Sequence, residues 1–407
     1  RTMSAHANPD IIDDGLVFMY DTDDGKSYKG EPTENLVPVG DRTLTTVLQR
    51  QSYHYAPWTY SLETNINGRA DVLKIYLNPT GSESSAPYAD FGFQAYKSGG
   101  SQVGDVYAVS FDYYVTKSTN TPSLLVAYAN GYKSPTSASA ATLGTYTTTD
   151  LGNGWVRATR ITTITTAGNT HWRFGLSSNY NETEVYVDNF QVELKSHATP
   201  FVDGTRSATQ GLLDRTGNET INLSDVSFNS NSEMIFDGTD DFIPLVDNPQ
   251  NGENSVSWEF ITKFDLVHDN ETSTYRQLYI QESSVWIGQY YDYIGIDIAK
   301  DNGSWFDGNG GRVTSSKIGP VNSGEYYHVV FTWDGTNVKG YLNSELGFTT
   351  AISGLTGIRN GVTPRRIGRR SGNPLIGEMP IVKLYNRALT AAEVLQNFNA
   401  IKSRFGL

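Results

Sequence analysis

Apolar and polar residues alternate along most of the chain, which is the two-residue period of strands that bury one face. The alternation is clear in "VLKIYLN" (72–78) and "VYAVSFDYYVT" (106–116). A hairpin is predicted over "YYHVVFTWDGTNVKGYLN" (326–343), because Asp334 and Gly335 offer a positive-φ turn between two apolar runs. The pattern therefore predicts an all-β protein.

Strand parity also sorts the aromatic residues into core and surface. In "HWRFGLSS", Trp172 shares a face with Phe174, so both are expected in the core. Tyr76 shares a face with Lys74, and Tyr114 falls with polar neighbours on its own strand. We therefore expect Tyr76 and Tyr114 to face outward.

One short helix is predicted near the C-terminus, in "LTAAEVLQNFNA" (389–400). Thr390 followed by Glu393 forms a capping box, which marks a helix start. Val394, Leu395 and Phe398 then form a short apolar stripe. We expect this stripe to pack against a sheet.

The two ends of the chain read as parts of one domain. A strand near the N-terminus stops as though its domain had barely begun, and the sequence after residue 205 continues as though that strand already existed. Insertion of a domain into a surface loop is tolerable because loop-closure entropy grows slowly with length. We predict two β-sandwich jelly rolls, one inserted into a loop of the other: a discontinuous outer domain (14–33 and 205–407), an inserted domain (34–204) and an N-terminal arm (1–13).

Composition narrows the possible partners. The chain carries 44 Asp and Glu against 31 Lys and Arg, and this acidic balance argues against binding to nucleic acid. Cysteine is absent, so disulfides and thiolate metal sites are excluded. No apolar run approaches the roughly 20 residues of a membrane span, and no signal peptide is visible. We expect a protein made in the cytoplasm, without membrane insertion.

Three aspartates cluster at the glycine turn in "MIFDGTDDFI" (234–243). Asp237, Asp240 and Asp241 could supply oxygen ligands to Ca²⁺, which takes six to eight of them. The alternative is turn chemistry, in which Asp side chains bond nearby backbone amides. No twelve-residue calcium-loop spacing is present, so turn chemistry is favoured, and calcium is kept as a possible cofactor.

The sequence offers only one candidate for the pair of carboxylates that glycosidases require, and its spacing is unsuitable. Glu184 and Asp188 lie on one face of "EVYVD", but about 13 Å apart along the strand, and Tyr186 stands between them. Retaining and inverting glycosidases hold their two carboxyl groups closer than this. We therefore expect no catalytic activity.

Aromatic side chains matter most for sugar binding, because they stack on the apolar face of a pyranose ring. "QSYHYAPWTY" (51–60) packs four aromatics into a stretch where Pro57 breaks the alternation, and loops on a rigid sandwich often carry binding residues. Packing of this loop on its own core is the alternative. The predicted carbohydrate-binding residues are Tyr55, Trp58, Tyr60, Tyr76 and Tyr114.

A basic cluster lies in "PRRIGRRSG" (364–372). Charge on an edge strand discourages pairing with other sheets, and this is the favoured explanation. An interface with an anionic glycan or an acidic subunit is the alternative.

Several segments of the outer domain together resemble a known family. "GLVFMYDT", "MIFDGTDDFI", "EYYHVVFTWDGTNVKGYLN" and "RRIGRRSGNPLIGEMPIVKLYNRALTAAEV" look like a laminin G-like, concanavalin A-like jelly roll. "DGLVFMYDTDDGKSY" and the terminal "YNRALTAAEVLQNFNAIKSRFGL" are similar to structural proteins of tailed, especially marine, bacteriophages. The resemblance implies a virion protein of the capsid or tail surface, with other virion proteins as partners.

The inserted block resembles the carbohydrate-binding modules of families four and nine. The likeness rests on "NLVPVGDRTL" near its start and "VYVDNFQVEL" near its end. In such modules a terminal Asp helps to hold a structural calcium, and Asp188 stands at that position, although Arg42 and Thr43 replace the acid that often follows the N-terminal turn. Acceptance of backbone hydrogen bonds at a strand end is the alternative role of Asp188.

These resemblances imply a non-catalytic virion protein that presents a glycan-binding module for attachment to host-surface glycans. Homo-oligomerisation is expected, since multivalent contact strengthens weak sugar binding. Two other classes stay open. A purely structural virion protein predicts subunit interfaces that cover the aromatics, and a glycan depolymerase predicts paired acids in a cleft.

Overall fold

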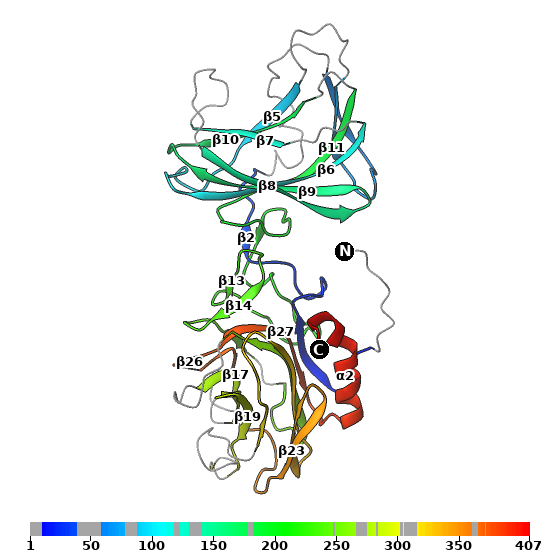
Figure 1. Cartoon of the computed structure of the whole chain (residues 1–407), viewed down its shortest axis with the longest axis vertical. Helices are drawn as coiled ribbons and strands as arrows, with labels where there is room; N and C mark the ends of the chain where they lie inside the picture. The colour runs from blue at the N-terminus through cyan, green and yellow to red at the C-terminus, as the bar shows by residue number, and fades with distance from the viewer. Residues whose placement is uncertain are drawn as a thin grey trace. The chain divides into compact units, whose positions relative to one another are not determined.

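The computed structural model divides into two compact units, each described by itself (Figure 1). Unit 1 comprises Thr33–Arg206, and unit 2 comprises residues 10–32 together with Ser207–Leu407. The sequence predicts an inserted domain at 34–204, and unit 1 covers that range. The structure describes residues 10–38, 58–77, 88–117, 123–129, 141–177, 182–246, 249–265, 275–281, 284–301, 304, 316–359, 365–370 and 372–407.

Unit 1 contains a six-stranded and a three-stranded antiparallel sheet, which form two layers in Figure 1. The six-stranded sheet runs in the order β3 (Trp58–Glu63), β4 (Val72–Leu77), β11 (Thr183–Glu193), β6 (Val106–Lys117), β9 (Trp155–Ile164) and β8 (Ala141–Gly152). The three-stranded sheet runs β5 (Tyr88–Gln94), β10 (Thr170–Ser177) and β7 (Ser123–Ala129). The short strands β2 (Thr33–Glu34) and β12 (Thr205–Arg206) pair where the chain enters and leaves the unit.

The core of unit 1 is built from alternate residues of these strands. Trp172 and Phe174 of β10 are fully buried and pack with Phe111 and Phe190, with ring centroids 5.1 Å apart for Phe111 and Phe174. The inward parity predicted for Trp172 and Phe174 is confirmed. A bulge in β11, where Asn189 has a positive φ, shifts the parity so that Phe190 also points inward.

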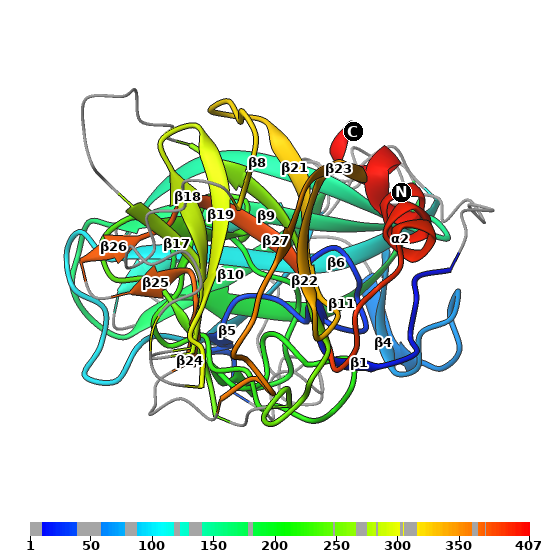
Figure 2. The same ribbon diagram turned by 90° about the horizontal axis from the view of Figure 1, so that it is seen from below.

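Unit 2 is a second sandwich. Its larger sheet has the order β13 (Ser227–Phe228), β14 (Met234–Asp237), β27 (Ile376–Tyr385), β16 (Val256–Phe264), β21 (Tyr326–Trp333), β22 (Asn337–Leu342) and β23 (Glu345–Ala351), with β1 (Leu16–Asp21) also paired to β27. Its smaller sheet has the order β15 (Ile243–Leu245), β24 (Arg365–Ile367), β17 (Tyr275–Gln281), β18 (Val285–Tyr290), β19 (Tyr293–Ile298) and β20 (Lys317–Ile318). A small hairpin joins β25 (Arg369–Arg370) to β26 (Asn373–Pro374). In Figure 2 the strands β18 and β19 form a layer separate from β21 and β22.

The N-terminal strand belongs to unit 2. β1 pairs antiparallel with β27, so that Leu16 lies opposite Tyr385 and Asp21 opposite Ile381. This is the pairing on which the nested reading of the sequence depends. The two sequence segments that bracket unit 1 therefore share one sheet.

The predicted hairpin is confirmed in the larger sheet. β21 and β22 pair, and Gly335 between them has a φ of 86°. Its Cβ-free backbone suits that left-handed conformation. Alternate residues of β21 fill the core of unit 2: Tyr327, Val329, Phe331 and Trp333.

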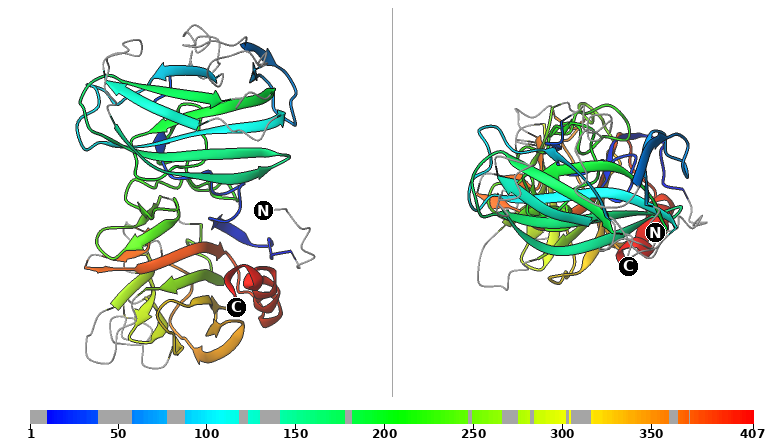
Figure 3. Two further views of the ribbon diagram at one scale, coloured as in Figure 1. Left: turned by 45° about the horizontal axis from the view of Figure 1, so that its top comes forward. Right: turned by 90° about the horizontal axis from the view of Figure 1, so that it is seen from above.

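Helix α2 (Ala391–Phe405) packs on the face of the larger sheet opposite this core, as Figure 3 shows in its left view. The capping box of Thr390 and Glu393 is present, as predicted. The predicted apolar stripe is partly wrong, because the buried face consists of Val394, Asn397 and Ile401. Leu395 is 48% exposed.

A buried polar cluster explains why an asparagine faces the sheet. Glu259 of β16 accepts hydrogen bonds from Lys383 Nζ at 2.7 Å and from Asn397 Nδ2 at 2.7 Å. His328 Nε2 lies 3.1 Å from the same carboxylate. Asn397 in turn accepts the backbone N–H of Ile12 at 2.7 Å, so the cluster joins the sheet, the helix and the N-terminal segment.

The edge-strand explanation of the basic cluster is wrong for Arg365 and Arg366, whereas Arg369 and Arg370 lie in β25, which pairs only with β26 among the described strands. β24 lies between β15 and β17, inside the smaller sheet. Its Arg365 is buried and donates to the carbonyl of Val246, while Arg366 lies over the ring of Phe242 at 4.7 Å. These arginines therefore serve packing within unit 2.

The all-β fold class with a C-terminal helix is confirmed. Among the residues that the structure describes, no helix combines the length and the apolar character needed to cross a membrane.

Candidate functional site

The candidate site lies on the outer face of the six-stranded sheet of unit 1, which we define as the face opposite the core. The register of β3, β4 and β11 sets Thr59 beside Tyr76 and Tyr76 beside Glu184. Intervening residues such as Ile75 and Val185 fill the core on the other side. Neighbouring strands are about 4.8 Å apart, so these polar and aromatic side chains form one continuous surface.

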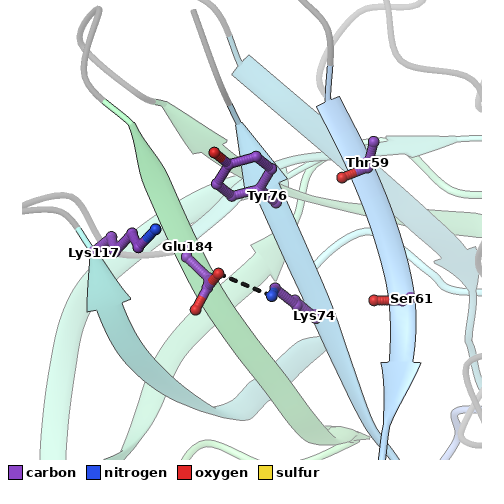
Figure 4. Close-up of a pocket in the computed structure, with 6 residues that line it drawn as sticks. All are labelled: Thr59, Ser61, Lys74, Tyr76, Lys117 and Glu184. Carbon is purple, nitrogen blue, oxygen red and sulfur yellow. Dashed lines mark ion pairs between the residues drawn. The ribbon is translucent and has the colours of Figure 1, made fainter.

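A hollow of about 190 Å³ opens on this face (Figure 4). Four strands contribute to its lining, which consists of Thr59, Ser61, Lys74, Tyr76, Lys117 and Glu184.

At one end of the hollow, Tyr76 and Lys117 share a carboxylate. The Tyr76 hydroxyl donates to Glu182 Oε1 at 2.6 Å, and Lys117 Nζ donates to the same oxygen at 2.8 Å. The hydrogen bonds from Lys117 and Tyr76 lower the pKa of Glu182, and the bond to Glu182 raises the pKa of Tyr76. Glu182 is therefore an ionised acceptor at neutral pH.

Glu184 is held more firmly in the middle of the face. Lys74 Nζ lies 2.9 Å from its Oε2, and Thr116 Oγ1 and the Tyr186 hydroxyl donate to its Oε1 at 2.7 and 3.2 Å. Burial raises the pKa of Glu184, but the hydrogen bonds from Thr116 and Lys74 outweigh burial and leave it below its usual range. A carboxyl group with a lowered pKa is a poor proton donor at neutral pH.

The part of the outer face beyond Tyr186 is filled by aromatic packing. The rings of Tyr114 and Tyr186 stack at 5.9 Å, and Tyr114 lies 5.7 Å from Trp155. Trp155 is only 2% exposed. These three rings therefore pack together against the outer face of the sheet and form the floor of this part of the surface. Tyr76 is the aromatic side chain that lines the hollow.

A turn over residues 66–69 covers the same floor. Asn67 and Gly68 both have positive φ values, and Ile66 bridges to Arg69. The turn places the Arg69 guanidinium over the Trp155 ring at 4.1 Å. Cation–π contact and charge pairing both fix this arginine.

Arg69 also forms ion pairs with two aspartates, Asp112 and Asp188. Its Nη1 lies 2.8 Å from Asp112 and 3.2 Å from Asp188, and Arg157 donates to Asp112 at 3.0 Å. Burial raises the pKa of Asp188, against the hydrogen bonds from Asn189 and Arg69. A guanidinium thus supplies the positive charge between the two carboxylates. Arg42 and Thr43, in the N-terminal turn, lie outside the described residues, and calcium at Asp188 stays a prediction.

The predicted sugar-binding residues are not all brought together. Tyr76 lines the hollow, and Tyr114 lies on the same outer face, partly buried. Tyr60 is 43% exposed but pairs with Ile75, so its side chain belongs to the other face of the sheet. Trp58 begins β3, and Tyr55 lies outside the described residues.

Asp237, Asp240 and Asp241 gather in unit 2, with one ligand atom of each within 4.8 Å of the others. Their observed partners are those of a turn. Asp241 accepts the backbone N–H of Asp237 at 2.6 Å and the Ser227 hydroxyl at 3.0 Å, and Asp237 accepts the N–H of Thr239 at 2.7 Å. Three carboxylates are fewer ligands than calcium takes, and calcium here stays a prediction.

Sequence reasoning missed the polar partners that complete the site. Lys117 and Glu182 are 65 residues apart and meet only through the pairing of β6 and β11. Arg69 could have been anticipated in part, since Asn67-Gly68 is a strong short hairpin signal. Its contact with Asp112 depends on the tertiary fold.

Solved structures that are similar to this chain match it over less than half of its length, with low sequence identity and low TM-scores. The receptor-binding domain of botulinum neurotoxin C/D mosaic serotype is 14% identical over 46% of this chain and 48% of its own, with a TM-score of 0.36. The binding domain of Paraclostridial Mosquitocidal Protein 1 is 17% identical over 46% and 49%, with a TM-score of 0.37. This chain spans about half the length of both. Domain 4 of an extracellular arabinanase from Geobacillus stearothermophilus, solved with arabinotriose, is 19% identical over 47% of this chain and 92% of its own, with a TM-score of 0.33.

No curated protein sequence matches the chain. A sequence model described as the concanavalin A-like lectin/glucanases superfamily matches residues 237–395. The match lies within unit 2 and takes in, among other strands, β15, β16, β21, β22 and the whole of β27. Over residues 237–395, unit 2 is thus similar to the concanavalin A-like lectin/glucanases superfamily.

Proposed function

We propose that the protein is a non-catalytic glycan-binding protein that takes sugar in the outer-face hollow of unit 1. The observation that carries this proposal is the position of Tyr76, whose ring lies between hydroxyl side chains on one side and charged groups on the other. An aromatic ring offers a stacking surface to the C–H face of a sugar, and the surrounding polar groups can bond its hydroxyls.

The charge arrangement supports binding over catalysis. Glu184 is fixed by three donors and has a lowered pKa, and Asp188, whose pKa burial raises, is ion-paired with Arg69. Hydrolysis of a glycosidic bond needs a second carboxyl group about 5–9.5 Å from the first, whereas Glu184 and Asp188 are four residues, about 13 Å, apart along β11. The match in unit 2 does not decide between binding and catalysis, because the description of that superfamily names both lectins and glucanases.

A finer proposal concerns location and assembly. The resemblance of the β1 and α2 segments to tailed-phage structural proteins supports display of unit 1 on a virion surface, with other virion proteins and host-surface glycans as partners. Oligomerisation would multiply weak sugar contacts. Immunogold electron microscopy of phage particles that carry this gene, with an antibody to unit 1, tests the location, and light scattering tests the oligomeric state. Unlabelled particles would refute the virion role.

A glycan array followed by titration calorimetry tests the binding function. We expect Tyr76→Ala to weaken binding about tenfold or more, since it removes the ring of the hollow. Tyr60→Ala is the matched control, because Tyr60 is an exposed tyrosine of the same sheet on the opposite face. Loss of binding in Tyr60→Ala with retention in Tyr76→Ala would move the site to the loop platform predicted at 51–60. Absence of binding by the folded protein would favour a purely structural role.

A further inference from the structure

Two hydrogen-bond donors at the end of the hollow converge on one carboxylate oxygen. The Tyr76 hydroxyl and Lys117 Nζ lie 2.6 and 2.8 Å from Glu182 Oε1. Figure 4 shows the Tyr76 hydroxyl and the Lys117 amino group turned toward the same space above β11. The donors come from β4 and β6, on either side of β11, so the sheet itself sets their spacing.

The acceptor in this arrangement is weakly held. The side chains of Glu182 and Lys117 are 45% and 51% exposed, and exposed ion pairs are weak and screened by salt. Glu182 precedes the first residue of β11 and bonds both donors through a single oxygen. Glu184, in contrast, uses both oxygens and is less exposed.

We propose that the hollow recognises an acidic glycan, and that a ligand carboxylate replaces the Glu182 carboxylate on Tyr76 and Lys117. Glu182 then acts as an internal occupant that holds the two donors in position until a uronate-type sugar arrives. The inference rests on the proposed function, and it adds the chemical class of the sugar. The sugar ring lies in the hollow, with Thr59 and Ser61 toward its hydroxyls.

The geometry favours a carboxylate for a simple reason. An ammonium and a phenol aimed at one oxygen reproduce the charge-assisted contacts that carboxylates prefer. A neutral hydroxyl at this position would leave the Lys117 charge without a counter-ion once Glu182 moves aside. The exchange of one carboxylate for another keeps Lys117 paired, and water solvates the displaced Glu182 carboxylate, which is already half-exposed.

The test uses the full-length protein and three polysaccharides: polygalacturonate, alginate and hyaluronan. Each is measured by calorimetry in two forms. The sodium salt, called the acid salt below, has ionised carboxylates, and the methyl ester keeps the sugar backbone but removes the charge. We expect at least one of them to bind as the acid salt, and esterification to weaken that binding about tenfold. Binding should also weaken between low and high salt, as exposed charge contacts do.

Two variants separate the roles of the donors and of the internal occupant. Lys117→Met should lower the affinity for the acid salt and leave that for the ester unchanged. Glu182→Gln should raise the affinity for the acid salt about two- to fivefold, because it removes the competing charge. Asp105→Asn is the matched control, since Asp105 pairs with Lys97 at the other end of β6 and should change neither affinity.

The outcomes distinguish this inference from the function on which it depends. Equal binding of acid and ester, or a loss of affinity in Glu182→Gln, would overturn the acidic-glycan inference. Binding of neutral glycans that depends on Tyr76 would then leave the proposed function in place. Failure of the folded protein to bind any acidic or neutral glycan would overturn both.

Discussion

Replacement of Glu259 by Gln is a direct test of the buried polar cluster beneath α2. Glu259 and Lys383 are fully enclosed, with side chains 1% and 0% exposed, and their charged atoms are 2.7 Å apart. The variant keeps the size of the side chain and removes its charge. Lys383 is then left in the interior without its counter-ion.

The magnitude follows from the ionisation of the carboxyl group. Burial raises the pKa of Glu259, but the charge of Lys383 and the hydrogen bond from His328 outweigh it, and the pKa falls to about 2 from an ordinary 4.5. At 1.36 kcal/mol for each pKa unit, the folded protein favours the ionised form by about 3 kcal/mol. Removing one partner of a buried ion pair costs about 3–5 kcal/mol. We therefore expect Glu259→Gln to lower the free energy of unfolding of unit 2 by about 3 kcal/mol at pH 7.

Urea denaturation between pH 7 and pH 2, followed by tryptophan fluorescence, measures this effect. A carboxyl group with a depressed pKa stabilises the folded state above its unfolded pKa, and that stability is lost as the pH falls toward the folded pKa. The difference between wild type and Glu259→Gln should thus be full above pH 4.5 and shrink toward pH 2. Glu378→Gln is the control, because Glu378 pairs with Lys263 at a more exposed position of the same sheet. A difference that stays constant over this pH range, or one no larger than that of the control, would refute the reasoning.

Three further predictions concern the stability of each unit. Arg69→Met should lower the unfolding free energy of unit 1 by about 2 kcal/mol in urea, because buried Asp112 loses one of its two arginines, and an unchanged midpoint would contradict the bridging role. Gly377→Ala should cost unit 2 about 3 kcal/mol, since Gly377 has a φ of 142° and an added Cβ would lie 2.0 Å from the carbonyl oxygen of Lys263; wild-type stability would contradict this close approach. EDTA should leave the melting temperature unchanged, because the turn at 237–241 is satisfied by its own hydrogen bonds, and a calcium-dependent rise would show that an ion joins it.

Strand alternation and capping motifs, which involve only a few consecutive residues, correctly predicted which side chains are buried in the strands and where the helix begins. Alternation assigned Trp172 and Phe174 to the core, because strand parity is a property of a few consecutive residues. The capping box at Thr390 was likewise readable, since its two hydrogen bonds span three residues. The same alternation placed Tyr76 on the outer face, where it lines the hollow.

The rest depended on pairing between distant segments. Lys117 meets Glu182 only because β6 and β11 are neighbours. The register of these two strands depends on bulges in β11 that no sequence pattern predicted. The buried face of α2 includes Asn397, which apolar periodicity cannot reveal, because its partner Glu259 lies 138 residues away. Arg365 reads as a surface charge in isolation, and its strand proved to be interior.

The pairing of β1 with β27 also determines how long β1 must wait for its partner strand during translation. Leu16 lies opposite Tyr385, so 369 residues must be translated after Leu16 before its partner exists. At about 5–20 residues per second, this wait is roughly 20–70 s on the ribosome. All strands of unit 1 are made within that interval. The nascent chain can thus complete the embedded sandwich first, while β1 stays unpaired with β27 until the residues of β27 have been made.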